Sequence, residues 1–461
     1  MDSSADELSD PRPGPPAIQA TGREETTGRE EAAAREDASR REEAAGREGA
    51  EGRRGAGGGR LGGLDGVRGL AALFVVLHHC RLLAYPGFPA DTGPWWASWL
   101  LYGHFAVVVF IALSGFSLAV SPARAGWRLG GVRRFARRRA WRILPPYWAA
   151  LLFSLVVAWT LAPQPGQPVP TGKTVVVYGL LLQDVFGSPS PNGALWSIAV
   201  EAQLYVLFPL LLLAVRRVGA TVTVGAVTVV VVAVGLLAPS VPAVGALMRL
   251  TPQFAVLFAV GVVAAAAARE TSRPARQPSG RAREPWRRAR QPSGPARETS
   301  RPAWGRRGAA LPWLALAAAA PVAVLIAVRS PAWTIGQLFW VDLALAPAAG
   351  LLLASVARGR PAPLVRLLDT RPVRSLGSFS YSLYLVHAPI VVALDRYVAA
   401  PLAEPGTGRF LLLLALAVPV SLVFARGFAA VFELPFQRHR SGAALRAAAR
   451  NRLTRQPGRP A

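Results

Sequence analysis

Long apolar segments, separated by short polar ones, run through the chain from about residue 64 to residue 433. A segment of about 20 mainly apolar residues is long enough to cross a bilayer as an α-helix. Ten segments have this character: residues 64–84, 103–120, 143–162, 196–215, 220–239, 251–268, 310–328, 335–355, 376–394 and 409–433. The pattern predicts an all-α integral membrane protein, a bundle of about ten transmembrane helices.

Basic residues in the connecting segments predict the orientation. Cytoplasmic loops of membrane proteins carry an excess of Lys and Arg, and residues 121–142 contain eight Arg and no acidic residue. With ten spans, the Arg-rich stretches 269–308 and 356–375 fall on that same side, and both termini are expected in the cytoplasm. Residues 174–186 are apolar but too short for a span, so we interpret them as an interfacial or re-entrant segment on the outer side.

The formal net charge of +26 is unevenly distributed along the chain. Fourteen of the 26 acidic residues lie in the first 60 positions, so the basic excess falls in short blocks beside apolar segments. This distribution is typical of membrane loops rather than of a nucleic-acid-binding face, and we expect a lipid bilayer but no nucleic acid as partner. The predicted domains are a disordered charged cytoplasmic tail (1–60), a membrane domain (61–436) with an inserted disordered Arg- and Pro-rich cytoplasmic linker (269–308), and a basic cytoplasmic tail (437–461).

The first apolar segment carries the titratable residues Asp65, Arg68, His78 and His79. Such residues are costly inside a membrane and mostly face a cavity or a partner. At about 100° per residue, Arg68 and His79 project within about 20° of each other and lie roughly 16 Å apart along the axis, whereas His78 points about 80° away. Asp65 is placed to pair with Arg68. The alternative is that the charged pair marks a membrane interface and the histidines only pack.

Ser197, Glu201 and Tyr205 recur every four residues in the fourth apolar segment and form a polar stripe. Glu201 is one of two acidic residues well inside a predicted span, the other being Asp342. A carboxyl group in that position is expected to become protonated or to find a cationic partner. Two interpretations of Glu201 stay open, a structural salt bridge and a functional group.

The ninth apolar segment begins with Ser380, Tyr381, Tyr384 and His387 at helical spacing. Hydroxyl groups in membrane helices often only join helices to one another, and a buried histidine often only packs. These structural alternatives stand beside a role in binding or catalysis. His104 has a weaker case and is expected at the outer interface.

Six arginines between Arg133 and Arg142 precede a Pro145–Pro146 pair, which should stop or restart a helix. The cytoplasmic charge rule alone explains this block. Because arginine also binds phosphate groups in bidentate fashion, coenzyme A and anionic lipid are candidate cytoplasmic ligands.

Taken together, these segments resemble the type-3 membrane acyltransferase family, the bacterial sugar and cell-surface O-acyltransferases. The resemblance covers residues 64–436 and includes, in the family's order, LDGVRGLAALFVVLHH (64–79), FIALSGF (110–116), RRRAWRILPPYW (137–148), LWSIAVEAQLYVLFP (195–209), GSFSYSLYLVH (377–387) and ELPFQR (433–438). One departure is Val108, where many members carry an acidic or polar residue.

The resemblance implies transfer of an acyl group, commonly acetyl, from acyl-CoA to a hydroxyl of a carbohydrate-containing acceptor, in the bacterial cell membrane. We expect His79 to act as general base toward that hydroxyl, and Glu201 to orient the imidazole or stabilise its charged form. Arg68 is expected to hold the donor together with the arginine loop. The residues expected to bind substrate are Arg139, Arg142, Ser114, Trp196, Ser197, Tyr381, Tyr384 and His387. Acyl-CoA enters as a substrate, and no metal or permanently bound cofactor is expected.

Two other function classes are kept open. A transporter or flippase for a lipid-linked or acylated sugar would also use about ten helices, although such folds often contain an internal repeat and none is evident here. A non-catalytic membrane scaffold is the other class. Some family members carry a C-terminal extracytoplasmic SGNH hydrolase-like domain, and the tail after Pro435 is too short for one. Acceptor handling is therefore expected within the membrane domain or with an extracytoplasmic partner.

Overall fold

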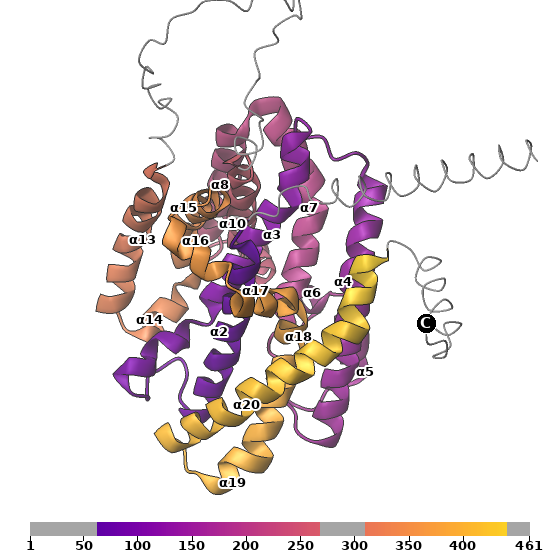
Figure 1. Cartoon of the computed structure of the whole chain (residues 1–461), viewed down its shortest axis with the longest axis vertical. Coiled ribbons are helices and arrows are strands. Elements are labelled where there is room, and N and C mark those ends of the chain that lie inside the picture. The colour runs from indigo at the N-terminus through magenta and orange to yellow at the C-terminus, as the bar shows by residue number, and fades with distance from the viewer. Residues whose placement is uncertain (1–61, 268–308, 440–461) are drawn as a thin grey trace, which may run out of the picture. The chain divides into compact units, whose positions relative to one another are not determined.

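The computed structural model describes residues 62–267 and 309–439, which belong to one compact unit. The described residues form helices joined by short loops, with no β-strand among them (Figure 1). The prediction of an all-α protein is confirmed for this part of the chain. The predicted N-terminal tail, the predicted linker and nearly all of the predicted C-terminal tail lie outside the described residues.

Ten helices make up most of the structure (Figure 1): α2 (Leu64–Ala84), α3 (His104–Arg124), α4 (Val132–Thr160), α7 (Trp196–Val218), α8 (Ala220–Leu237), α10 (Gln253–Ala264), α13 (Leu311–Val328), α15 (Leu338–Ala357), α18 (Ser380–Leu394) and α20 (Thr407–Phe428). Shorter helical segments connect or extend them: η1 (Trp95–Tyr102), α5 (Gly172–Gly179), α6 (Gln183–Phe186), α9 (Pro242–Leu247), η2 (Met248–Leu250), α14 (Pro331–Gly336), α16 (Ala362–Leu368), α17 (Arg371–Ser378), η3 (Asp395–Ala399), α19 (Ala400–Leu402), η4 (Ala429–Glu433) and α21 (Leu434–Arg438).

The described residues contain nine helices long and apolar enough to cross a membrane, and ten if the bent pair formed by α9–η2 and α10 is one span. This number agrees with the predicted bundle of about ten spans, while the cytoplasmic position of the termini stays a prediction. The bent pair changes direction by 49° at its break. Residues 174–186 lie largely in α5 and α6, which are too short to span a bilayer, as the sequence indicated.

Glycines allow close approach between the helices that surround the polar residues. A Cβ atom on Gly261 of α10 would collide with the carbonyl oxygen of Ala112 on α3, and one on Gly377 of α17 would collide with the carbonyl oxygen of Asp65 on α2. Close backbone contact at small residues is a main source of helix association inside membranes. These two contacts therefore help to hold α2 and α3 in place.

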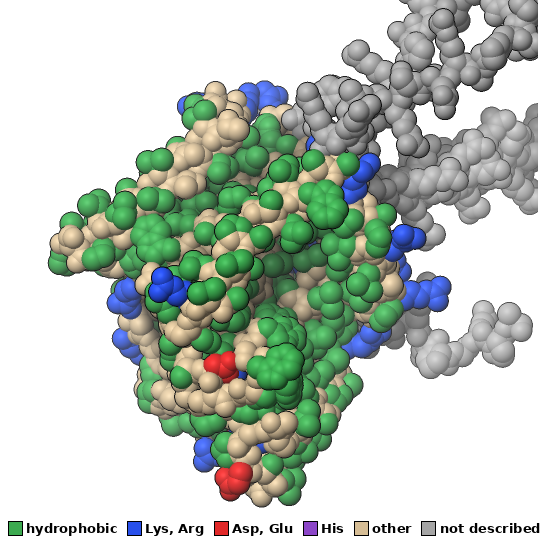
Figure 2. Space-filling model, turned by 90° about the vertical axis from the view of Figure 1, so that its left-hand side faces the viewer, with side chains coloured by type: hydrophobic (Ala, Val, Ile, Leu, Met, Phe, Trp, Pro, Cys, Tyr) green, Lys and Arg blue, Asp and Glu red, His purple; other side chains and the backbone are tan. Residues whose placement is uncertain are grey.

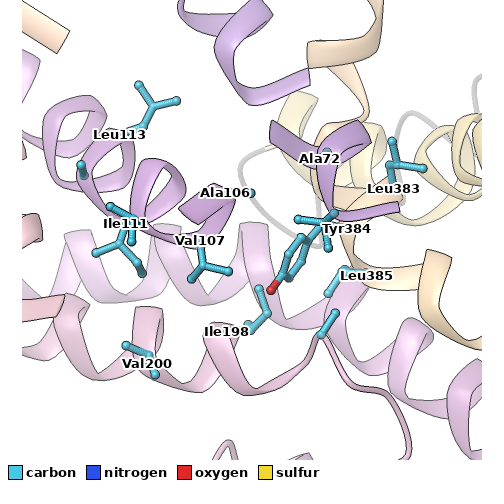
Figure 3. Close-up of a cluster of buried hydrophobic side chains, with 14 of the residues drawn as sticks. Ala72, Ala106, Val107, Ile111, Leu113, Ile198, Val200, Leu383, Tyr384 and Leu385 are labelled. Atoms are coloured by element: carbon cyan, nitrogen blue, oxygen red, sulfur yellow. The ribbon is translucent and has the colours of Figure 1, made fainter. Parts of the chain in front are cut away.

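A hydrophobic core fills the space where α2, α3, α7 and α18 meet. Figure 3 shows Ala72, Val107, Ile198 and Leu383, one from each of these helices, among the buried side chains of this core. The hydroxyl group of Tyr384 points from α18 toward α7 in the same view. The core therefore surrounds polar groups as well as apolar ones.

Apolar side chains also cover much of the outer surface. Figure 2 shows a mainly hydrophobic face with Lys and Arg side chains lying mostly around its margin. On α8 and α13, Val229, Leu236, Trp313 and Val328 are all more than half exposed. A surface of this kind is suited to contact with lipid rather than with water, as expected of a multi-pass membrane protein.

Candidate functional site

Two histidines from different helices meet at one end of the candidate site. The rings of His79 on α2 and His387 on α18 are 4.8 Å apart between centroids, and His79 Nδ1 lies 3.3 Å from His387 Nε2. His387 is fully buried, whereas His79 is partly exposed. The ring of the neighbouring His78 packs edge-on against His79, with centroids 5.1 Å apart, and its Nδ1 contacts the carbonyl oxygen of Leu100. The structure therefore brings together His79 and His387, two of the predicted site residues.

Backbone carbonyl groups around the two histidines determine which ring nitrogens carry protons. His79 Nδ1 lies 2.8 Å from the carbonyl oxygen of Val75, and His387 Nδ1 lies 2.8 Å from that of Tyr384. Because a carbonyl oxygen only accepts, both Nδ1 atoms donate in the neutral rings, and His387 Nε2 accepts from His79 Nδ1–H. His79 Nε2 then keeps a free lone pair and has no hydrogen-bond partner within residues 62–267 and 309–439. This nitrogen is the atom able to take up a proton.

A pair of buried hydroxyl groups lies beside the two histidines. The hydroxyl oxygens of Ser197 on α7 and Tyr384 on α18 are 2.7 Å apart. Ser197 and Tyr384 are both buried. Because Tyr384 precedes His387 by one helical turn, this hydrogen bond joins the stripe on α7 to the histidine pair.

Glu201 lies one turn further along α7 and is the centre of a second hydrogen-bond group. Its Oε1 accepts hydrogen bonds from Ser114 Oγ, at 2.6 Å, and from the Tyr205 hydroxyl, and these two hydroxyl oxygens are themselves 3.1 Å apart. Within the described residues Glu201 makes no hydrogen bond to His79, and its role toward the imidazole stays a prediction. The nitrogen to be oriented is held by a backbone carbonyl group and by His387 instead.

Arg68 lies near the beginning of α2, roughly 16 Å from His79 along the helix axis. Its Nη2 donates a hydrogen bond of 2.6 Å to Ser117 Oγ on α3. Its Nη1 lies 3.6 Å from the Asp65 carboxylate, the pairing that their three-residue spacing predicted. These contacts direct the guanidinium group toward α3 and the interior of the bundle.

Three arginines and one carboxylate form a charged group at this end. Arg68 and Arg139 each interact electrostatically with Glu201 and Tyr205 and with Arg142. Arg139 and Arg142 come from the first turns of α4, where the sequence predicted an arginine block. The excess of positive charge suits a polyanionic ligand. Among the described residues, no cluster of His, Cys, Asp and Glu side chains has the arrangement of a metal site.

The hydrogen-bonded groups and the charged group together form one polar path through the core, which we call the polar track. Successive members are joined by a hydrogen bond, an electrostatic interaction or one helical turn. From the arginine end to the histidine end, the members of the polar track are Arg142, Arg139, Arg68, Tyr205, Ser114, Glu201, Ser197, Tyr384, His387 and His79. Because polar groups are costly in a membrane interior, their gathering marks this track as the candidate functional site.

Two other predicted binding residues have partners beside the track. The Tyr381 hydroxyl donates a hydrogen bond of 3.3 Å to the carbonyl oxygen of Ile143 on α4. Trp196 stacks on His104, with ring centroids 6.0 Å apart and planes inclined by 5°.

His104 has a more definite environment than the outer interface that the sequence indicated. Its Nε2 lies 2.8 Å from an oxygen of Asp342, whose side chain is fully buried on α15. Gln253 Nε2 lies 3.4 Å from the same oxygen. The second acidic residue of the predicted spans is therefore a helix-joining partner of His104.

Asn192 is a buried residue that sequence reasoning missed. Its Nδ2 donates to Ser154 Oγ at 3.0 Å and to the carbonyl oxygen of Leu385 at 2.8 Å, while its Oδ1 accepts from the Ala194 backbone at 2.9 Å. These bonds hold the segment before α7 against α4 and α18. No periodic pattern marks this residue, because its partners are 38 and 193 residues away in the sequence.

Comparisons with known proteins identify related chains. The acyltransferase-3 family, described as an acyltransferase domain, matches residues 61–426. Over 163 residues, 32% of this chain, the sequence is 29% identical to the putative peptidoglycan O-acetyltransferase YrhL of Bacillus subtilis and 25% identical to the peptidoglycan O-acetyltransferase OatA of Listeria monocytogenes. Over 166 residues, 33% of this chain, it is 26% identical to the O-acetyltransferase OatA of Staphylococcus aureus.

The matched stretches cover only 23% of YrhL and 24% of each OatA protein. No solved structure shows significant similarity to the chain. The family match is much longer than these stretches and includes every member of the polar track. The chain therefore belongs to the acyltransferase-3 family.

Proposed function

We propose that this protein is an acyltransferase of the bacterial cell membrane that transfers an acyl group, acetyl in the first instance, from acyl-CoA to a hydroxyl of a carbohydrate-containing acceptor. Membership of the acyltransferase-3 family supports acyl transfer. The relatives are named O-acetyltransferases, and two of the names include peptidoglycan, one of them as putative. These names support acetyl as the group and a carbohydrate as the acceptor. The observation that carries the mechanism is the free Nε2 of His79.

Arg68, Arg139 and Arg142 hold the phosphate groups of the donor in this proposal. Their combined charge exceeds that of Glu201, the carboxylate that interacts with Arg68 and Arg139. Glu201 limits the repulsion between the arginines and holds the hydroxyl groups of Ser114 and Tyr205.

The polar track gives the flexible pantetheine arm of the donor a route from the arginines to His79. Hydroxyl groups are hydrogen-bond partners for the amides and the thioester carbonyl of that arm. Ser197 and Tyr384 lie between the charged group and the histidine pair, so we assign them to this stretch. Tyr381 and Trp196 pack beside it and shape its walls.

His79 Nε2 takes the proton of the acceptor hydroxyl as its oxygen attacks the thioester carbonyl carbon. The new carbon–oxygen bond replaces the carbon–sulfur bond, and the proton then passes to the departing thiolate, giving an O-acyl ester and free coenzyme A. His387 Nε2 accepts from His79 Nδ1–H throughout and stabilises the charged imidazolium that forms in between.

The first test incubates purified protein in detergent with radiolabelled acetyl-CoA and a panel of sugars. We expect label to move to an acceptor with the wild type and His79→Ala to lower turnover by about 100-fold or more, because general base catalysis contributes this much. His78→Ala is the matched control, since this imidazole only packs against His79 and its hydrogen-bond partner, Leu100, lies outside the track. We expect this control to keep turnover within about threefold of the wild type.

Near-normal turnover of folded His79→Ala would contradict the assignment of the base. Failure of the folded wild type to bind or turn over any acyl-CoA would contradict acyl transfer itself. That result would favour the transporter of a lipid-linked or acylated sugar, whose ligand is then sought by binding of labelled glycolipids.

A further inference from the structure

Two residues outside the polar track lie near the free nitrogen of His79. A Cβ atom built on Gly193 would lie 3.8 Å from His79 Nε2 and 3.8 Å from Gln164 Oε1. Gly193 lies in the segment before α7, and Gln164 lies in the segment after α4. Gly193 is thus close both to the Gln164 amide and to the nitrogen that takes the proton.

The Gln164 side chain is almost completely buried, with 7% of its surface exposed. Its amide makes no hydrogen bond to any residue in the part of the chain that the structure describes. The amide atoms are nevertheless not among the fully buried polar atoms that lack a partner, so they keep some accessible surface. An amide offers two donor hydrogens and an accepting oxygen to a ligand that reaches it. The hydroxyl groups of a bound carbohydrate are suitable partners for this amide.

The position of Gly193 is fixed by its neighbour. Asn192 is fully buried and is hydrogen-bonded to Ser154, to the Leu385 backbone and to the Ala194 backbone. Gly193 itself is exposed, so its free side opens to the exterior. The approach to His79 Nε2 therefore passes a rigidly held glycine.

Neither packing nor backbone conformation explains glycine at this position. The backbone of Gly193 is outside the left-handed region, which other residues avoid. A Cβ atom would meet its neighbours only at ordinary van der Waals distance. Because glycine has no side chain, the space next to His79 Nε2 stays open.

We propose that Gln164 and Gly193 form the acceptor subsite, in which the Gln164 amide hydrogen-bonds a hydroxyl of the carbohydrate and Gly193 leaves room for the reacting hydroxyl at His79 Nε2. The inference rests on the proposed acyl transfer and adds to it the residues that recognise the acceptor. Two neighbouring hydroxyls of a sugar fit this arrangement, one held by the amide and one delivered to the imidazole. A simple alcohol has only one hydroxyl and therefore lacks the one that the amide would hold.

The test compares Gly193→Leu and Gln164→Ala with the wild type in the radiolabel assay, using N-acetylglucosamine and chito-oligosaccharides as acceptors. We expect Gly193→Leu to reduce transfer to sugar by about 30-fold or more through exclusion of the acceptor, with unchanged affinity for acetyl-CoA. Gln164→Ala should raise the acceptor KM about fivefold, the effect of losing one neutral hydrogen bond. Gln164→Glu, which keeps an accepting oxygen at the same reach, should raise it less.

Gly179→Leu is the control for adding a side chain at an open glycine, because nothing lies within 4 Å of a Cβ atom there. It should leave acceptor KM unchanged. Equal acceptor KM and turnover in wild type, Gly193→Leu and Gln164→Ala would overturn the subsite while leaving acyl transfer established. Loss of acetyl-CoA binding in Gly193→Leu would equally overturn it, by placing the residue on the donor side. A wild type that transfers label to no sugar would refute acyl transfer to carbohydrate, and the subsite with it.

Discussion

The two ends of the polar track contain different kinds of polar group. At the arginine end, Arg68, Arg139 and Arg142 share one group with the Glu201 carboxylate. At the histidine end, the hydrogen-bond partners of the two imidazoles in the described residues are each other and backbone carbonyl groups. Fixed charge suits the binding of an anion, and a neutral imidazole suits the uptake of a proton. This difference supports the proposed division, with donor binding at one end and proton transfer at the other.

The largest effect that separates the two ends is expected from Arg68→Ala. We expect the dissociation constant for acetyl-CoA to rise about 100-fold, because removal of one partner of a buried charge contact costs several kcal/mol. Isothermal titration in detergent measures this constant directly. Arg68→Lys keeps the charge without the bidentate geometry and should lose less. If His79→Ala weakened donor binding as strongly as Arg68→Ala, the division between the ends would be refuted.

A smaller effect, on turnover alone, is expected from His387→Phe. The phenyl ring cannot accept from His79 Nδ1–H, so the imidazolium formed during transfer loses its partner, and we expect kcat to fall about 30-fold with an unchanged donor KM. His387→Gln keeps an accepting oxygen and should restore part of the rate. Steady-state kinetics with acetyl-CoA as the varied substrate checks both variants. A rise in donor KM at constant kcat would move His387 to the binding end.

Glu201→Gln should change donor affinity at the arginine end in the opposite direction to Arg68→Ala. The substituted amide would still accept a hydrogen bond from Ser114 or Tyr205, but the arginines would lose their carboxylate, so we expect acetyl-CoA to bind about threefold more tightly at low ionic strength. The gain should disappear at about 1 M salt, where charges are screened within a few ångströms. Isothermal titration at the two salt concentrations measures the change. A fall in kcat as large as that of His79→Ala would instead place Glu201 beside the reacting atoms.

Relationships within one helix could be predicted from the sequence, because helical geometry fixes them. The pairing of Asp65 with Arg68 and the choice of His79 over His78 both follow from residue spacing alone. The same holds for the Glu201–Tyr205 hydrogen bond, which joins residues four apart. Apolar length likewise predicted the spans.

Contacts between helices could not be predicted in this way. His79 and His387 are 308 residues apart, and helical periodicity says nothing of which helices are neighbours. The spacing of Glu201 could therefore not indicate its hydrogen bond with Ser114 on another helix. Residues in connecting segments, such as Gln164 and Asn192, carry no periodic signal at all. The bend between α9–η2 and α10 was missed for a related reason, since an apolar run does not indicate where a helix changes direction.

The smallest effect is expected from substitution of a titratable residue outside the polar track. This residue serves as a reference for the substitutions within the track. Asp184 on α6 accepts a hydrogen bond of 3.1 Å from Gln203, and partial burial raises the pKa of its carboxyl group from 3.8 to about 6. Between these two values the folded protein binds more protons than the unfolded chain, so this group lowers the free energy of unfolding as pH rises.

Asp184→Asn removes that titration while keeping an oxygen that accepts from Gln203. We therefore expect the variant to match the wild type in Tm near pH 4 and to exceed it by about 2 °C at pH 7, a modest difference because solvent screens a partly exposed group. Differential scanning fluorimetry in detergent across this pH range measures the difference. Acetyl-CoA affinity and kcat should stay unchanged, because α6 lies outside the polar track. A change in either would mean that the track extends to α6, and the simple contrast between its two ends would no longer hold.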